Sequence, residues 1–111
     1  MQLNRVRGYV IVNIPDNFNH DDIALWEDTV LHQLSISPDV GGVIVDLSAV
    51  RSTDASDLRR LHQMLCSIHL LGREVALAGI SPGLAALVVH SRVELFHDRT
   101  GCGIDDILEP H

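Results

Sequence analysis

Length, composition and charge already exclude several classes of function. The chain has 111 residues, enough for one folded domain with its own core, and 46% of them are hydrophobic. The formal net charge is −7, and all eight cationic side chains are arginines. This balance argues against binding to nucleic acid or to an anionic membrane surface, because both need clustered cationic side chains.

Targeting signals and cysteine usage point to a cytoplasmic protein. No apolar run approaches the roughly 18 residues needed to span a bilayer, so we expect no membrane insertion. The first residues lack the apolar stretch and the cleavage site of a signal peptide. The two cysteines, Cys66 and Cys102, are too few and too far apart for a disulfide scaffold.

The first forty residues predict a strand and then a helix. Residues 9–14 are rich in β-branched side chains and lie between a glycine and a proline, which is typical of a strand. The weak alternation of residues 1–7 allows an edge strand beside it. Asn19 is expected to cap a helix. The apolar residues of that helix recur at helical spacing and should form one buried face: Ile23, Trp26, Val30 and Leu34.

The rest of the chain repeats this alternation. Short apolar runs predict strands at 43–47 and 75–78, and a helix begins near Asp54 and ends before Gly72. The next helix starts at Ser81 and Pro82, with Leu84, Leu87 and Val88 expected to face inward. Residues 93–96 are expected to form a last short strand, followed by a helical turn at 103–108.

The order of these elements predicts an α/β fold. Strands separated by single helices need crossover connections, so the central strands should be parallel and the crossovers right-handed. No linker, repeat or low-complexity segment divides the chain. We therefore expect one domain over residues 1–111, a small mixed sheet with helices packed on it.

Motifs for catalysis or for a metal or cofactor are not evident. Seven histidines stand out, but none occur in the HxxxH or HxH spacing of a metal site. The G-x-S-x-G letters of a nucleophile elbow occur at residues 79–83, GISPG, but the serine there is expected to cap the next helix, and no phosphate-binding glycine loop is present. We expect surface histidines, no cofactor and no enzymatic activity.

The informative segment is residues 46–58, DLSAVRSTDASDL. A buried strand ends there, a loop crosses the carboxyl edge of the sheet, and a helix opens at Asp54. Ligands and partners of α/β folds meet this edge, and a helix start offers unpaired amides. Taken alone, the segment is most simply a strand–loop–helix connection with an aspartate cap.

Two motifs together resemble the STAS family, the sulfate-transporter and anti-sigma-factor-antagonist domain. The first is the Asp-Leu-Ser-x-Val of residues 46–50, followed by an Asp at the helix start. The second is residues 71–82, LGREVALAGISP, similar to the family's G-x-x-V-x-L-x-G-I-x-P segment. The resemblance covers almost the whole chain and is weakest in residues 1–40. Within the family, the chain is most similar to RsbS-like stressosome proteins and anti-sigma-factor antagonists.

The resemblance implies a non-enzymatic signalling role and a set of partners. Such proteins have a sheet with helices on one side and switch partners under a serine/threonine kinase. The kinase modifies a Ser or Thr directly after the Asp that opens the second helix, and a phosphatase reverses it. Stressosome members also assemble with STAS-domain sensor paralogues, so a homo- or hetero-oligomer is expected.

The chain departs from the family pattern at the phosphorylation site. Ala55 follows Asp54, so the hydroxyl is absent, and Ser56 is the fallback, with Thr53 on the other side of Asp54. Either Ala55 replaces a native serine, or the chain is a natural variant. We expect the partner to bind the following residues: Thr53, Asp54, Ala55, Ser56, Asp57, Arg59 and Arg60. For Arg59 and Arg60, a solvated helix face is the simpler interpretation.

Two other functions remain open from the sequence. One is a STAS regulatory subunit of a membrane lipid-transport complex, working beside an ATPase. The other is a small nucleotide-binding protein that uses the strand ends.

Overall fold

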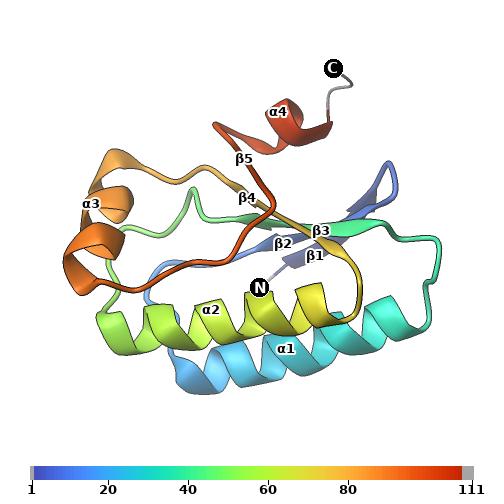
Figure 1. Cartoon of the computed structure of the whole chain (residues 1–111), viewed down its shortest axis with the longest axis horizontal. Coiled ribbons are helices and arrows are strands. Elements are labelled where there is room, and N and C mark those ends of the chain that lie inside the picture. The colour runs from blue at the N-terminus through green and yellow to red at the C-terminus, as the bar shows by residue number, and fades with distance from the viewer. Residues whose placement is uncertain (1, 109–111) are drawn as a thin grey trace.

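The fold alternates strands and helices along the chain. A computed structural model describes residues 2–108 (Figure 1). The strands are β1 (Gln2–Val6), β2 (Tyr9–Asn13), β3 (Gly42–Asp46), β4 (Glu74–Ala78) and β5 (Arg99–Gly101). The helices are α1 (His20–Ser35), α2 (Ala55–Leu70), α3 (Pro82–Ser91) and α4 (Ile104–Leu108).

The sheet is mixed, as the sequence predicts. Its five strands are ordered β1-β2-β3-β4-β5. β1 pairs antiparallel with β2, and β2, β3, β4 and β5 pair parallel with one another. The crossover helices therefore all begin at the carboxyl edge of the parallel strands.

The two faces of the sheet are covered unequally. Figure 1 shows α1 and α2 side by side on one face and the short α4 on the opposite face. The larger core joins sheet residues such as Val45 to the buried stripes of α1 and α2. A smaller cluster on the other face packs Ile107 of α4 against Ile11, Ile44 and Ala76. The expectation of helices on one side thus holds for α1 and α2 and fails for α4.

The helix starts lie where the sequence predicts them. Asn19 caps α1 in a capping box with Asp22, and Asp54 caps α2 by accepting the Asp57 N–H at 2.8 Å. Ser81 caps α3, with Pro82 as its first residue. These local signals are reliable because each cap satisfies donors of its own helix.

One prediction about the C-terminal third is wrong. Residues 93–96 are not a strand; Val93 and Leu95 are buried in the core as irregular chain, and the last strand is Arg99–Gly101. In α3 the three residues expected to face inward do so: Leu84 is buried, and Leu87 and Val88 are half-buried and pack against the core. Apolar side chains indicate burial, and burial does not require a strand.

The first family-like motif has a structural explanation. Asp46 Oδ1 accepts the Ser48 N–H at 3.0 Å, which turns the chain sharply after β3. The Leu47 N–H then donates to the Ala78 carbonyl at 2.8 Å. Gly79, with φ +74°, lies so close that a Cβ there would stand 2.8 Å from the Ser48 Cβ. The two motifs therefore pack on each other and fix the course of the β3–α2 loop.

Candidate functional site at the start of helix α2

Two loops meet at the carboxyl edge of the sheet and are tied together by Asp16. This residue follows β2, and its Oδ1 accepts the backbone N–H groups of Arg51 at 2.8 Å and Ser52 at 3.0 Å. These hydrogen bonds hold the pKa of Asp16 below its ordinary value, because they favour the charged carboxylate. The Ser52 hydroxyl also donates to Asn17 Oδ1 at 3.1 Å. The β3–α2 loop is thus held in place from the β2–α1 loop.

The first turn of α2 presents its side chains in different directions. Ala55 is half-buried and packs against the core, Ser56 is exposed, and Asp57 is half-buried. One residue along a helix rotates a side chain by about 100°, which explains the change from Ala55 to Ser56. A hydroxyl at position 55 and the hydroxyl of Ser56 would therefore face different surroundings.

A contact between helices, which the sequence does not reveal, engages Ser56. His20, the first residue of α1, places its Nε2 2.8 Å from the Ser56 hydroxyl and 3.2 Å from Asp57 Oδ1. His20 and Ser56 are 36 residues apart, so no local pattern links them. The hydroxyl of Ser56, the alternative phosphorylation site, is therefore exposed but already hydrogen-bonded within the molecule.

A shallow hollow of about 370 Å³ lies between the starts of α1 and α2. It is lined by Phe18 and by six residues with polar side chains: Asn17, Asn19, Ser52, Thr53, Asp54 and Asp57. Thr53 Oγ1 is buried and has no hydrogen-bond partner among the described residues. With two carboxylates and no cationic side chain in its lining, the hollow is not suited to an anionic ligand.

The two arginines of the predicted partner surface are placed differently. Arg60 is largely buried and forms a two-pronged ion pair with Glu27 of α1, at 3.2 and 3.3 Å. Arg59 is exposed, and within residues 2–108 no ion pair is recorded for it. Arg60 therefore joins α1 to α2, and Arg59 is the cation of this pair that a partner can reach.

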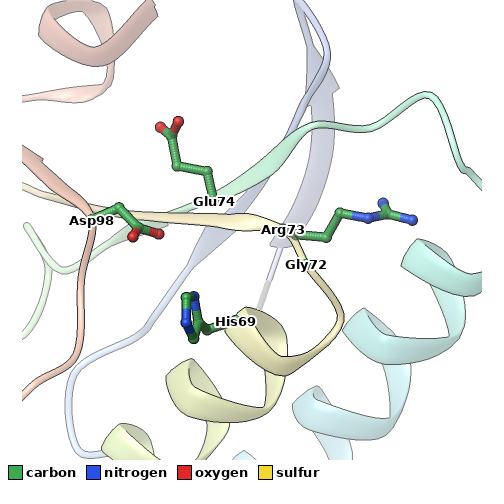
Figure 2. A pocket seen from close by; sticks show the side chains of 5 residues that line it. All are labelled: His69, Gly72, Arg73, Glu74 and Asp98. Carbon is green, nitrogen blue, oxygen red and sulfur yellow. The ribbon is translucent and has the colours of Figure 1, made fainter.

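A second hollow, of about 320 Å³, lies at the opposite edge of the sheet (Figure 2). The Arg73 side chain points away from it and donates to carbonyls in the last turn of α1 and just after that helix, the shortest bond being 2.7 Å to Val40. Glu74 Oε1 accepts from Arg99 at 2.8 Å, and Asp98 accepts the Val75 N–H at 2.8 Å. Its charged side chains are thus engaged in holding the fold together.

Other features of the described residues limit the possible chemistry. Between residues 2 and 108, no three His, Cys, Asp or Glu side chains lie close enough to hold a metal ion. None of the helices in that range is long and apolar enough to cross a bilayer. Cys66 is half-buried with its Sγ 3.5 Å from His62 Nε2, and Cys102 is exposed.

Comparison with solved structures finds close agreement in fold. A chain in a structure of the stressosome, described as a signal integration and transduction hub, has a TM-score of 0.78 and 24% identity. The match covers 94% of this chain and 90% of that one. A serine-to-glutamate variant of Moorella thermoacetica RsbS has a TM-score of 0.77 and 22% identity, over 94% and 87%. Unphosphorylated SpoIIAA, an anti-sigma factor antagonist, has a TM-score of 0.67 and 12% identity, over 96% and 93%.

Sequence comparison identifies the family. No curated protein matches significantly. The model of the STAS domain family matches residues 1–98, which include β1 to β4, α1 to α3 and both motifs discussed above. Because the match spans most of the sequence and the fold agrees with it, the chain belongs to the STAS domain family.

Proposed function

We propose that this chain is a non-enzymatic, cytoplasmic signalling protein of the anti-sigma-factor-antagonist or stressosome type, which switches partners under a serine/threonine kinase. The observation that supports this proposal most directly is the position of the α2 start: Asp54, Ala55 and Ser56 lie at the carboxyl edge of β3, beside the start of α1. The fold shared with RsbS and SpoIIAA supports the same proposal.

The partner surface in this proposal is the α2 start together with Arg59. Asp54 and Ser56 are exposed, and Thr53 and Asp57 line the hollow next to them. Arg60 contributes indirectly, since its ion pair with Glu27 joins α2 to α1. A docked kinase would therefore meet a surface formed by residues 53–59 and the first residues of α1.

The kinase acts on position 55 in this proposal, where the chain has no hydroxyl. A phosphoryl group there would add about −1.5 to −2 charges beside Asp54 and Asp57. Together with these carboxylates, the phosphoryl group would repel acidic groups of a docked partner. Phosphorylation would therefore change which partner binds more than whether the domain folds. With Ala55, the chain is fixed in its unphosphorylated state.

The direct test compares phosphorylation of the unmodified chain with that of the Ala55→Ser variant. The purified kinase that copurifies with the tagged protein would be incubated with ATP and either the wild-type chain or Ala55→Ser. We expect mass spectrometry to find one phosphoryl group on Ala55→Ser, located at residue 55, and none on the wild type. Ala55→Thr is a second positive variant, and Ala55→Ser with Asp54→Asn tests the capping carboxylate.

The outcomes separate the alternatives. Labelling of the wild type at Ser56 would show that the switch has moved by one residue and would refute the assignment of Ala55. Copurification of an ATPase in place of a kinase and STAS paralogues would favour the transport-complex subunit. Raised thermal stability with nucleotides alone would favour the nucleotide-binding protein.

A further inference from the structure

The first strand of the sheet is a free edge. β1 pairs with β2 on one side, and Asn4, Arg5 and Val6 are all exposed. No other described strand pairs with β1. Exposed edge strands offer unpaired N–H and C=O groups to another strand.

The register fixes which backbone groups of β1 face outward. The hairpin turn at Arg7 and Gly8 has positive φ at both residues, 50° and 82°, so Val6 and Tyr9 flank a two-residue loop as a hydrogen-bonded pair. The Ile14 N–H donates to the Asp46 carbonyl on the β3 side, which places the odd-numbered residues of β2 towards β1. Because pairs alternate along an antiparallel ladder, the N–H and C=O groups of Leu3 and Arg5 point away from β2.

We propose that a second copy of this chain pairs antiparallel with β1, with the two-fold axis at Asn4. In this register Leu3 of each copy lies opposite Arg5 of the other, and both exchange N–H···O bonds. All five residues of β1 overlap with the partner strand, and the two five-stranded sheets become one. The inference rests on strand geometry and is independent of the kinase proposal.

Charge and side-chain chemistry favour this register over its neighbours. Centring the pair on Arg5 would place two guanidinium groups opposite each other, which is destabilising. Centring it on Asn4 instead lays the apolar stem of Arg5 along Leu3, which is itself half-buried against the core. The charge of Arg5 is already offset by Asp39, whose Oδ2 lies 2.8 Å from Arg5 Nη2. A charged residue on an edge strand usually opposes pairing with another strand, and the ion pair with Asp39 weakens this effect of Arg5.

The first test removes one outward donor. Proline at position 5 deletes an N–H that β2 does not use, so the hairpin should persist while pairing with a second copy is lost. We expect light scattering to give a dimeric mass for the wild-type chain and a monomeric mass for Arg5→Pro. Arg5→Gln, which loses the Asp39 pair and keeps the N–H, should stay dimeric.

The second test reads the register by cross-linking. In a background of Cys66→Ser and Cys102→Ser, Asn4→Cys places two thiols on the axis, where opposed Cα atoms lie about 4.5 Å apart, within disulfide range. Val6→Cys is the matched control, because its two copies would lie roughly 13 Å apart along the strands. We expect mild oxidation to cross-link Asn4→Cys and to leave Val6→Cys monomeric on a non-reducing gel.

Three results would overturn the proposal. One is a monomeric wild-type chain at all concentrations, which would leave the edge free or open to a strand of a different protein. Another is a dimer that Arg5→Pro leaves unchanged although the variant is folded by circular dichroism. The third is cross-linking of Val6→Cys as efficient as that of Asn4→Cys.

Discussion

Among single residues, Gly79 shows why the second family-like motif needs a glycine. Its φ is +74°, and a Cβ would meet Ser48 Cβ at 2.8 Å and Asp46 Oδ1 at 3.0 Å. Gly72 provides a natural comparison, because its φ is +78° but nothing lies within 4 Å of the Cβ position. A side chain at position 72 would therefore meet backbone strain alone, whereas one at position 79 would meet both backbone strain and steric crowding.

We predict that Gly79→Ala destabilises the fold more than Gly72→Ala. Both substitutions place alanine in the left-handed region, at a cost of about 1–2 kcal/mol. Gly79→Ala must also displace the turn after β3, which adds about 1–3 kcal/mol. Urea denaturation of both variants measures the difference in the free energy of unfolding. Equal losses of stability would show that the turn after β3 accommodates the extra methyl group without destabilising the fold.

Single residues also mark the limit of prediction from sequence. The caps Asn19, Asp54 and Ser81 were predictable because a helix start is determined by its own first turn. The contact of His20 with Ser56 was not, because it depends on how α1 and α2 pack. The same packing gives Arg60 its partner Glu27, which the sequence interpretation left on a solvated or partner-binding face.

At the level of elements, the connection between the two loops makes stability depend on pH. The Asp16 carboxylate accepts two backbone N–H bonds from the β3–α2 loop, and its pKa lies below the ordinary 3.8. The folded state therefore favours the charged form. This stabilisation is complete above the unfolded pKa and disappears as the pH falls through the folded pKa.

We predict that Asp16→Asn lowers the free energy of unfolding at neutral pH. The difference from the wild type should shrink as the pH falls below about 4, where the wild-type carboxyl also becomes neutral. Chemical denaturation of both proteins between pH 7 and pH 2.5 measures it. A difference that stays constant over this range would contradict a role for the charge.

The strands show what periodicity can and cannot predict. β2, β3 and β4 lie in the sheet interior, where apolar runs are required, and they were predicted to within a residue or two. β5 has the sequence RTG, without an apolar residue, because only three residues pair at the sheet margin. The apolar residues Val93 and Leu95 suggested a strand, although they fill the core beside α2 and α3 from an irregular segment.

For the whole molecule, β5 and α4 form an outer unit beyond the residues that match the family model. Ile107 is buried in the smaller cluster, and Arg99 Nη2 donates to its carbonyl at 3.2 Å. Arg99 also reaches Tyr9, whose pKa is raised by burial and by the neighbouring Glu74 carboxylate. The second face of the sheet is thus covered through few contacts.

We predict that this outer unit opens before the rest of the molecule. Ile107→Ala removes its main apolar contact, so amide hydrogen exchange in residues 99–108 should accelerate while β3 stays protected. Val89→Ala, at a position 76% exposed, is the control and should change neither region. Equal acceleration in β3 would mean that α4 unfolds only with the whole domain.

The free edge at β1 has a consequence for the number of partners that the proposed dimer could bind. Because the two β1 strands pair antiparallel in the proposed dimer, the parallel strands of the second copy run opposite to those of the first. The two α2 starts then lie at opposite ends of the joined sheet, far from each other. A dimer built in this way is bivalent, and a partner bound at one end leaves the other end open. Because the two sites face opposite directions, one flat surface that carries kinases could engage only one of them at a time, and avidity would require a partner that spans both ends.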